Sequence, residues 1–589
     1  MFISKVKVEN FRNLENFEIN LNKGLNVILG ENNVGKTNLV SALRIALNCF
    51  FDPVEPINLS KDDIYINGEG KQNFSKPIRI TLEFNGIDSV PLEAEFQSIL
   101  ADGTTISPRT AYLTFNWSWN EKNQRYTRGW YGGIGNNSVD SDIFQSLPIT
   151  YLGALRDALK QIIPGKRNYI SELFNLKVLK NPEHKEELVD KINKANEEMS
   201  KSTLIKAVEN DLNDNLKRVC GDKAFKQEAS INSSETSFEQ IIQNLKGNIT
   251  ELSTNGLGYN NLLCISIIIA KLCMQLEDSE NIKVPLLIIE EPEAHLHPQL
   301  QALLAETLDN NCSNDKKVQT IVTSHSAVLS QNVEPESIHL MYNTGTKIKS
   351  FSLINLKNTF VDKKLSWGKF KRFVDITKAT MFFAKGIIFV EGITEAMLIN
   401  KLATEMGYNL KEHGVSIIPC GVEFKEIAEL YTSDGINIPV SIITDSDPET
   451  QKDDKDKIIG LKNKEKCARV KNLIENYDNK NSLQIFTSDV TLEYELAKAN
   501  INDLEPILVA WEQIHPNRGS KLRELINNET ENQEKIKAIW LDICTTSKNS
   551  KCEFMEQLLM QIEENFLKIE CPIYIKQAIE HVIGEYGEH

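Results

Sequence analysis

Residues 30–37 have the composition and spacing of a loop that binds nucleotide phosphates. They read GENNVGKT, which matches G-x-x-x-x-G-K-[ST], between the apolar run LNVIL and a helix-favouring segment. In such a loop backbone amides surround the phosphate oxygens, Lys36 reaches the β- and γ-phosphates, and the hydroxyl of Thr37 ligates Mg²⁺. The alternative is a glycine-rich turn without a ligand, which the flanking strand and helix disfavour. The predicted ligands of ATP with Mg²⁺ in this segment are Asn32, Asn33, Gly35, Lys36, Thr37 and Asn38.

Two adjacent carboxylates follow an apolar strand predicted at residues 284–289. We expect Glu290 to bind Mg²⁺ through water and Glu291 to polarise the water that attacks the γ-phosphate. The alternative is an acidic turn after a core strand. Two carboxylates at a buried strand end are costly without a cation, so this alternative weakens once Lys36 and Thr37 supply the other half of an ATP site.

Two more segments indicate the kind of ATPase. Residues 252–258, LSTNGLG, form a turn before an apolar helix, and TSHS at residues 323–326 follows the strand QTIVT. Both resemble an ABC-type head, in which Ser253 would contact the γ-phosphate held by the opposite subunit and His325 would hydrogen-bond that phosphate and the attacking water. Taken alone, the turn is a weak signal, and His325 is more simply a capping or core histidine.

A signature turn of this kind cannot reach the phosphate bound by its own subunit. This arrangement therefore predicts a homodimer or a higher even oligomer, at least when ATP is bound. His295 and His297 could form a metal pair or lie in a structural loop that faces the partner head. We favour the loop because no cysteine or third histidine lies nearby in the sequence.

A second group of carboxylates follows short apolar strands in the C-terminal half. Glu391 and Glu395 come after IIFV, and Asp445 and Asp447 come after IIT. Acids on alternate residues face the same way, and such groups can converge on hard cations. They predict an all-oxygen site for two divalent metals, Mg²⁺ or Mn²⁺, which would activate a water and stabilise the leaving oxygen at a phosphodiester. The alternative is that these acids are ordinary loop residues at strand ends. The occurrence of all four within one α/β unit disfavours this alternative.

The elements that position these residues alternate between strands and helices. A helix is predicted at 36–48, and strands are predicted at 4–9, 24–29, 78–84, 111–119, 284–289, 319–323, 386–390, 415–418 and 440–444. We expect an α/β fold in which an ABC/SMC-like P-loop ATPase head is interrupted by a helical dimerisation arm. The predicted segments are 1–160 and 246–370 for the head, 161–245 for the arm, 371–500 for a second α/β domain, and 501–589 for a helical part that completes the site of that domain.

The composition is that of a soluble globular protein. The chain has 589 residues, which is more than a single small module contains. Its net charge of −16 disfavours a general polyanion-binding surface. The 10 cysteines form no C-x-x-C pair, which favours a reducing compartment without a zinc site. The N-terminus reads as a strand and not a signal peptide, and the apolar run 262–270 is too short to span a bilayer. We expect a cytoplasmic protein with no membrane contact.

Four segments of the first 350 residues resemble the SMC-like ATPase heads of the OLD (overcoming lysogenization defect) family. They are NFRN at 10–13, GENNVGKTN at 30–38, LLIIEEPEAHLHP at 286–298 and TSHS at 323–326. This resemblance implies that Arg12 lies near the nucleotide.

The C-terminal carboxylates resemble those of a Toprim domain, which topoisomerases, primases and OLD nucleases share. TLE at 491–493, KCEF at 551–554 and PIYI at 572–575 resemble the T-L-E, K-G-x-F and P-x-Y-I segments of the OLD family. The resemblance implies that Glu493 is a further metal ligand and that Lys551 stabilises charge on the cleaved phosphate. Cys552 stands where glycine is usual, and Gly421-Val422 stands where two glycines are common. As isolated residues, Glu493 and Lys551 would be ordinary surface charges.

Together the resemblances imply an ATP-dependent and metal-dependent endonuclease that acts on double-stranded DNA in bacterial anti-phage defence. A second defence component, a helicase-like protein or a retron nucleic acid, is an expected partner. ATP could either license or restrain cleavage. The alternative is an ATP-gated sensor or scaffold that binds DNA without cutting it, which the acidic net charge and the low specificity of single carboxylates favour. A topoisomerase and a primase are disfavoured because strand-passage domains and a Cys/His zinc module are missing.

Overall fold

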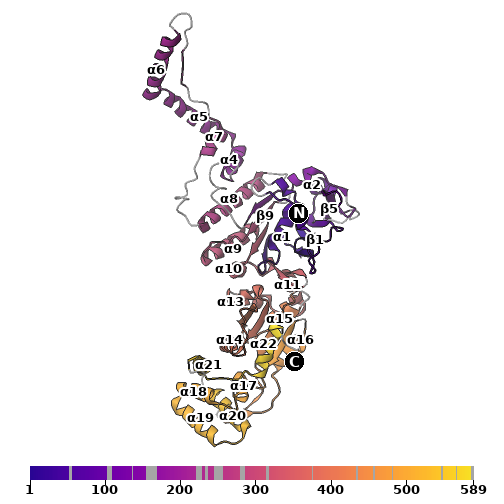
Figure 1. Cartoon of the computed structure of the whole chain (residues 1–589), viewed down its shortest axis with the longest axis vertical. Helices are drawn as coiled ribbons and strands as arrows, with labels where there is room; N and C mark the ends of the chain where they lie inside the picture. Colours follow the sequence, from indigo (N-terminus) through magenta and orange to yellow (C-terminus); the bar gives the residue numbers. More distant parts are fainter. Residues whose placement is uncertain are drawn as a thin grey trace. The chain divides into compact units, whose positions relative to one another are not determined.

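The computed structural model describes residues 1–51, 56–101, 109–135, 137–153, 169–220, 228–231, 236–244, 257–278, 285–313, 318–345, 347–374, 376–432, 436–454, 458–480, 482–544, 548–564 and 567–584. The chain divides into unit 1, Met1–Asp140 with Ile321–His589, and unit 2, Ser141–Thr320. Figure 1 labels the helices and strands of both. None of the described helices combines the length and apolar character that a bilayer crossing requires.

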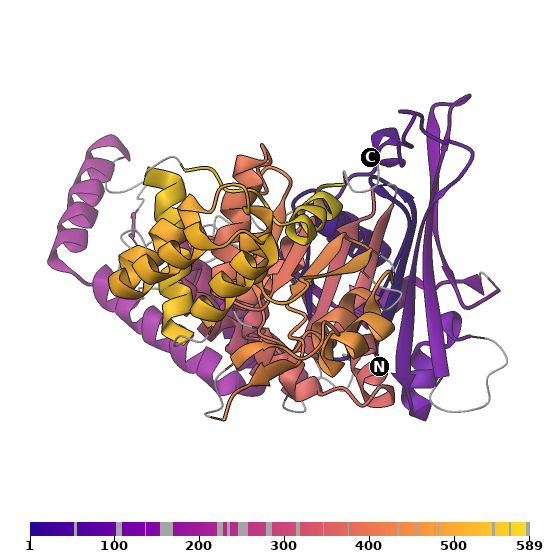
Figure 2. The same cartoon turned by 90° about the horizontal axis from the view of Figure 1, so that it is seen from below.

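The first sheet of unit 1 is antiparallel and covers the helix that follows the P-loop. Its strand order is β2-β1-β4-β5-β6-β7. The strands are β1 (Phe2–Phe11), β2 (Leu14–Asn20), β4 (Ile78–Ile87), β5 (Arg109–Asn120), β6 (Arg125–Gly132) and β7 (Asn137–Ser138). Val6, Leu82 and Leu113 lie opposite one another on β1, β4 and β5, and all three are buried. This apolar face packs on α1 (Lys36–Ala46). The long strands β4, β5 and β6 run side by side in Figure 2.

A second group of strands in unit 1 positions the P-loop. Their order is β12-β11-β3-β10, and they are β3 (Leu25–Leu29), β10 (Gln319–Ser324), β11 (Ile338–Asn343) and β12 (Ile348–Ser352). All five residues of β3 are buried and β11 runs parallel to it, as in the centre of an α/β sheet. The strands predicted at 24–29 and 319–323 are confirmed. The helix predicted at 36–48 ends at Ala46, because Asn48 has a left-handed backbone with φ of 62°.

Unit 2 consists of two paired strands and a series of helices. Strands β8 (Ile149–Leu152) and β9 (Leu286–Glu290) are parallel, and β9 is buried throughout. The helices are α4 (Tyr169–Lys180), α5 (Pro182–Ser200), α6 (Thr203–Cys220), α7 (Phe238–Asn244), α8 (Leu257–Asp278) and α9 (Pro298–Ser313). The described residues of the predicted arm are thus helical, in α4 to α7. On α6 the exposed residues Leu204, Val208 and Leu212 recur every four positions and form one apolar stripe.

A parallel sheet forms the second α/β part of unit 1. Its order is β14-β13-β15-β18, with strands β13 (Gly386–Val390), β14 (Val415–Pro419), β15 (Val440–Thr444) and β18 (Leu483–Thr487). Each strand is followed along the chain by a helix: α14 (Ile393–Glu405), α15 (Lys425–Thr432), α16 (Ala468–Tyr477) and α17 (Leu492–Ala499). A hairpin of β16 (Thr450–Lys452) and β17 (Ile458–Leu461) lies between β15 and α16. The strands predicted at 386–390, 415–418 and 440–444 are confirmed, whereas β18 was not predicted.

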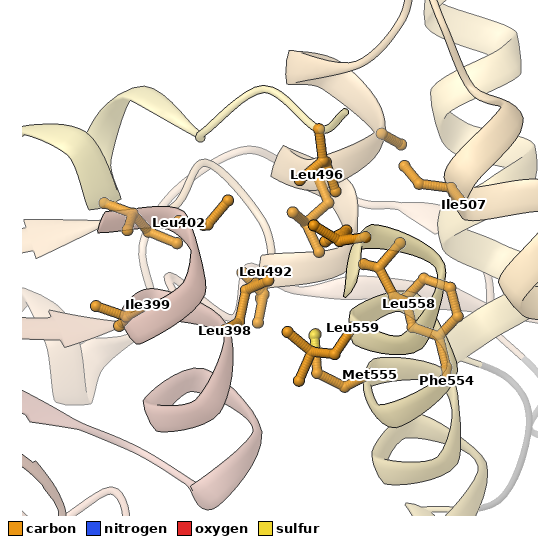
Figure 3. Close-up of a cluster of buried hydrophobic side chains, with 14 of the residues drawn as sticks. Leu398, Ile399, Leu402, Leu492, Leu496, Ile507, Phe554, Met555, Leu558 and Leu559 are labelled. Atoms are coloured by element: carbon orange, nitrogen blue, oxygen red, sulfur yellow. The ribbon is translucent and has the colours of Figure 1, made fainter. Parts of the chain in front are cut away.

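The C-terminal helices share one hydrophobic core with this sheet. They are α18 (Glu505–Ile514), α19 (Pro516–Asn528), α20 (Asn532–Cys544), α21 (Lys548–Glu564) and α22 (Ile573–Ile583). Figure 3 shows Leu398 of α14, Leu496 of α17, Ile507 of α18 and Leu558 of α21 in the same cluster. Burial of each such side chain contributes roughly 1.5–3 kcal/mol. This shared core therefore holds α17 and α21 against the sheet.

Short helices connect β12 to the parallel sheet. They are α11 (Leu353–Asp362), α12 (Trp367–Phe373) and α13 (Ile376–Ala379), whereas α10 (Ala327–Gln331) lies earlier, between β10 and β11. Just after α11, Lys363 Nζ donates to both carboxylate oxygens of Glu429 on α15, at 2.8 and 2.9 Å. Glu429 is only 1% exposed, so this ion pair ties the connecting segment firmly to the second α/β part.

Candidate functional site

The P-loop closes around the ammonium group of Lys36. Gly35, with φ of 97°, caps α1, and a Cβ at this position would lie 2.7 Å from Asn13 Oδ1. The position therefore requires glycine for its backbone conformation and for the close approach of its neighbour. Lys36 is buried, and its Nζ donates to the carbonyl oxygens of Gly30 and Glu31, both at 2.8 Å. These carbonyls hold the lysine charge inside the loop, where a phosphate oxygen would be bound.

Arg12 is linked to the P-loop helix. Its Nε donates to Asp63 Oδ1 at 2.8 Å and its Nη1 donates to Asn38 Oδ1 at 3.0 Å. Asn38 Nδ2 in turn donates to Asn13 Oδ1 at 2.7 Å, and Asn13 Nδ2 donates to Asn33 O at 3.1 Å. The NFRN segment and the P-loop are therefore joined by a chain of hydrogen bonds, which brings the predicted residues Arg12, Asn33 and Asn38 together.

A cleft of about 760 Å³ lies beside this network, and Arg12, Asn33, Tyr65 and Ile66 line it. Asn32, Asn33 and Thr37 are exposed. Of the predicted loop residues, Asn33 therefore lines the cleft, while Lys36 is buried.

His325 lies beside the P-loop and does not cap the next helix. Its Nδ1 is 3.5 Å from Lys36 Nζ. The cap of α10 is Ser326, whose Oγ accepts from Leu329 N at 3.0 Å. His325 is half-buried. The capping and core interpretations are therefore wrong for His325, and its role toward the γ-phosphate stays a prediction.

In unit 2, Glu290 is the last residue of β9 and Glu291 follows it. Glu290 is 4% exposed, and its Oε1 accepts a hydrogen bond from the Tyr151 hydroxyl at 3.0 Å. Glu291 has a left-handed backbone with φ of 43°, which is unfavourable for a residue with a Cβ and is common at functional sites. Ser253, the predicted signature serine, lies outside the described residues.

The loop with His295 and His297 packs on the start of α8. A Cβ at Gly258 would lie 2.5 Å from the carbonyl oxygen of His295, and Asn261 Nδ2 donates to Ala294 O at 3.3 Å. His297 Nδ1 accepts from Gln299 N at 3.4 Å, at the beginning of α9. These contacts are those of a structural loop, and the part of the chain that the structure describes contains no metal-holding group of His, Cys, Asp and Glu there.

The predicted carboxylates of the second α/β part meet at one edge of the sheet. Glu391 follows β13, and Asp445 and Asp447 follow its parallel neighbour β15, so their side chains start from adjacent strand ends. Glu391 Oε1 accepts from Thr444 Oγ1 and from Asp445 N, the latter at 3.2 Å. Asp447 has a left-handed backbone with φ of 44°.

Glu395 lies four residues after Glu391, and the position of its carboxylate accounts for the glycine at position 392 between them. A Cβ at Gly392 would lie 2.8 Å from Glu395 Oε2, which accepts a hydrogen bond from Thr394 Oγ1 at 2.9 Å. The absence of a side chain at Gly392 leaves space for the Glu395 carboxylate at the start of α14.

Asp445 has the most strongly perturbed carboxyl group of this edge. Burial raises its pKa well above the ordinary value, and the nearby carboxylates of Glu493, Glu391 and Asp447 raise it further. The Ser488 hydroxyl donates to Asp445 Oδ1 at 3.0 Å and partly opposes this shift. Four acidic side chains that disfavour one another's charge are suited to binding a cation.

Glu493 and Lys551 form an ion pair beside Asp445. Lys551 Nζ lies 3.0 Å from Glu493 Oε1, and Thr491 Oγ1 donates to Glu493 Oε2 at 2.7 Å. Burial alone would raise the pKa of Glu493, but Lys551 and Thr491 hold it below its usual value. Both residues lie in the site and are not ordinary surface charges. Cys552 is exposed on α21, so it leaves the contact of Lys551 undisturbed.

The donor set fits hard divalent cations, because every predicted ligand supplies carboxylate oxygens. Within the described ranges, no three His, Cys, Asp or Glu side chains already have a metal-holding arrangement. Two cations of the chain occupy several of these oxygens: Lys551 pairs with Glu493, and Arg469 pairs with Glu391 and Asp447.

Arg469 and Ser488 were missed by sequence reasoning. Arg469 follows the β16–β17 hairpin, and no fixed spacing relates it to Asp447. Ser488 directly follows the unpredicted strand β18. The only available signal was a serine directly after an apolar run, LQIFTS, which is too common to indicate a site.

Comparison with known proteins identifies both parts. The family model described as "AAA ATPase domain" matches residues 1–122 and 153–329, half of the chain. The chain belongs to this ATPase family. A model described as "Overcoming lysogenization defect protein-like, TOPRIM domain" matches residues 382–447, which contain Glu391, Asp445 and Asp447. Domains of these two kinds generally use ATP with Mg²⁺ and divalent metals, respectively.

The chain is also similar to nucleases over most of its length. It is 22% identical to Endonuclease GajA of Bacillus cereus (strain VD045) over 90% of this chain and 95% of that protein. It is 23% identical to the OLD nuclease of Thermus scotoductus (strain ATCC 700910 / SA-01) over 76% of this chain and 82% of that protein. A solved C-terminal region of the Burkholderia pseudomallei OLD protein is 28% identical over 34% of this chain and 97% of that chain, with a TM-score of 0.20. The predicted combination of an ATPase head with an OLD-type Toprim domain is confirmed.

Proposed function

We propose that the chain is an ATP-binding and ATP-hydrolysing endonuclease that uses divalent metal ions to cut double-stranded DNA. The observation that carries this proposal is the meeting of Glu391, Asp445 and Asp447 at one sheet edge, with the Lys551–Glu493 ion pair electrostatically coupled to Asp445. The similarity to proteins named Endonuclease GajA and OLD nuclease supports it.

The proposed metal ligands are Glu391, Glu395, Asp445, Asp447 and Glu493. Two ions of Mg²⁺ or Mn²⁺ bound by these carboxylates would supply an activated water and charge stabilisation at the leaving oxygen. Ser488 would hold the carboxylate of Asp445, and Thr491 that of Glu493, through the hydrogen bonds that the structure contains. Lys551 would place a fixed positive charge where the cleaved phosphate gains negative charge.

The nuclease assignment is tested by nicking of supercoiled plasmid with Mg²⁺ or Mn²⁺, with and without ATP. Asp445→Asn is expected to lower the nicking rate by about a hundredfold or more. Asp542→Asn is the matched control, because Asp542 is also hydrogen-bonded, by Trp511 Nε1 at 2.7 Å and by Arg518 Nε at 2.6 Å, but outside the site. Equal nicking by the wild type and Asp445→Asn would remove the nuclease assignment.

The proposed ATP site uses the P-loop residues and the two glutamates after β9. A bound nucleotide would exchange the carbonyl contacts of Lys36 for phosphate oxygens, Thr37 and Glu290 would hold Mg²⁺, and Glu291 would orient the attacking water with His325. Lys36→Ala is expected to abolish binding of a fluorescent ATP analogue. Lys71→Ala, which removes an exposed lysine paired with Glu69, is expected to bind it normally.

A homodimer, in which Ser253 of one subunit completes the ATP site of the other, is part of this proposal. The apolar stripe Leu204, Val208 and Leu212 on α6 supports a contact through the arm. A role in anti-phage defence, with a helicase-like protein or a retron nucleic acid as second component, stays a prediction from the family resemblance.

The second candidate is an ATP-gated DNA-binding scaffold without nuclease activity. Two observations favour it: the net charge of −16, and the pairing of the site carboxylates with Arg469 and Lys551. Metal-dependent nicking that requires Asp445 would exclude it.

A further inference from the structure

The guanidinium group of Arg469 lies between two carboxylates of the proposed metal site. Its Nη2 donates to Glu391 Oε1 at 3.2 Å and to Asp447 Oδ2 at 3.0 Å. The guanidinium also donates from Nη1 to Thr444 Oγ1 at 3.1 Å, from Nη1 to Val422 O at 3.3 Å and from Nη2 to Asp445 O at 3.5 Å. Each partner oxygen belongs to Thr444, the last residue of β15, or to a residue within three positions after the end of β13, β14 or β15.

Arg469 contacts the same two carboxylates that would bind a divalent cation. Glu391 and Asp447 come from adjacent parallel strands, and a single nitrogen, Nη2, bridges them. Each carboxylate offers two oxygens to a metal, and Arg469 already contacts one oxygen of each, Glu391 Oε1 and Asp447 Oδ2. A metal that uses either of these two oxygens therefore competes with Arg469 for it.

Access to solvent makes such a displacement feasible. The side chain of Arg469 is 27% exposed and that of Asp447 is 51% exposed. By contrast, Lys551 pairs with Glu493, whose side chain is only 8% exposed, and Lys551 does not bridge Glu391 and Asp447 in the part of the chain that the structure describes. Of these two cations, Arg469 is the one that bridges Glu391 and the exposed Asp447.

We propose that Arg469 is a resident counter-cation of the Toprim carboxylates, which a divalent metal ion displaces from Glu391 and Asp447. The proposal rests on the proposed function in that it takes these two residues as metal ligands. Arg469 is then a positioning residue: it compensates the mutual repulsion of the carboxylates before metal binds, and it lowers the affinity of the site for metal by competing for the same oxygens.

The test measures Mn²⁺ binding to the full-length protein without nucleotide, by electron paramagnetic resonance of free Mn²⁺ or by calorimetry. Arg469→Met removes the competitor and is expected to lower the Kd for Mn²⁺ about tenfold, since hydrogen bonds to charged groups carry enough free energy for such a change. Arg469→Lys retains a charge that bridges less well and is expected to fall between Arg469→Met and the wild type.

Arg523→Met is the matched control. Arg523 also pairs with two carboxylates, Glu505 and Glu512, and its side chain is likewise 27% exposed, but it lies in the helical part. Its substitution is expected to leave the Kd for Mn²⁺ unchanged. Thermal melting of every variant shows whether it is folded.

Two outcomes separate this inference from the proposed function. If folded Arg469→Met binds Mn²⁺ with the same or lower affinity than the wild type, while Glu391→Gln and Asp447→Asn bind it more weakly, Arg469 supports the ligands and does not compete, so the inference is overturned and the metal site stands. If Glu391→Gln and Asp447→Asn bind Mn²⁺ as the wild type does, both the metal site and the inference are overturned.

Discussion

The carboxyl group of Asp445 shows how a single position is suited to a ligand at the expense of stability. Its side chain is half-buried, and its pKa is raised by that burial and then by Glu493, Glu391 and Asp447. The Ser488 hydroxyl donates a hydrogen bond to this carboxylate and partly opposes the rise. An amide or an apolar residue would cost less free energy there, so the acid is expected to serve a cation.

Gly392→Ala is predicted to separate metal binding from folding. The added Cβ would lie 2.8 Å from Glu395 Oε2, the far end of a flexible side chain, so the carboxylate would shift while the backbone stays. The melting temperature is expected to change by less than about 2 °C, and nicking is expected to fall about tenfold. Gly460→Ala, with its nearest atom 3.9 Å away, is the control for nicking and melting. Full activity in Gly392→Ala would show that Glu395 is not a ligand.

His339 predicts a pH dependence of stability in the ATPase part. Its Nδ1 is 2.6 Å from Ser352 Oγ and its Nε2 is 2.9 Å from Asn26 Oδ1, and burial lowers the pKa of His339 from 6.5 to about 3. Between about pH 3 and pH 6.5, His339 is therefore protonated in the unfolded chain but neutral in the folded chain. The stabilisation is fully present above about pH 6.5 and is lost as the pH falls toward 3.

His339→Gln removes this titration. We expect the variant to be less stable than the wild type at pH 7 by roughly 1–3 kcal/mol. This deficit should shrink by about 2 kcal/mol at pH 5, as measured by urea unfolding at both values. His413→Gln, at an exposed position, is the control. A deficit that stays constant with pH would contradict the assignment.

At the scale of elements, the parallel order of β13 and β15 is what brings Glu391 to Asp445. Neighbouring parallel strands end at the same edge, so Glu391 and Asp445 lie close together although they are 54 positions apart in the sequence. The core that α14, α17, α18 and α21 share then holds Glu493 and Lys551 next to this edge. The site is therefore as rigid as that core.

The arm helix α6 is predicted to mediate self-association. Leu204, Val208 and Leu212 are 75%, 45% and 44% exposed on one face of the helix. A double substitution Leu204→Asp and Val208→Asp would place charges in an apolar contact and is expected to convert the dimer to a monomer in sedimentation velocity. Lys206→Asp, exposed on the same helix but off the stripe, is expected to remain dimeric. A dimer that survives the double substitution would place the contact elsewhere.

At the scale of the molecule, the ATPase and Toprim parts must communicate if ATP controls cleavage. Lys363, just after α11, pairs with both oxygens of Glu429 on α15, and Glu429 is 1% exposed. Glu429 is buried but the Lys363 side chain is 51% exposed, so removal of Lys363 alone would leave the buried carboxylate without this partner. The pair is therefore a direct contact between the segment after the head and the Toprim helices.

Lys363→Met combined with Glu429→Gln is predicted to uncouple the two activities. The double variant removes both charges and avoids an unpaired buried carboxylate, so it is expected to fold. The ratio of nicking with ATP to nicking without ATP should approach one, whichever direction ATP acts in the wild type. ATP hydrolysis should be unchanged. Lys369→Met, which removes an exposed pair with Glu423, is the control, and an unaltered ratio in the double variant would exclude this route.

Motifs and strand ends were readable from the amino-acid order because each depends on residues within a few positions of one another. The P-loop, the carboxylates after β13 and β15, and nine of the 18 described strands belong to this class. The placement of Arg469 and Ser488 was not readable, because their contacts join residues 78 and 43 positions apart, to Glu391 and Asp445. Such contacts arise only when strands and helices pack, since packing and not local pattern chooses which distant side chains share a buried edge.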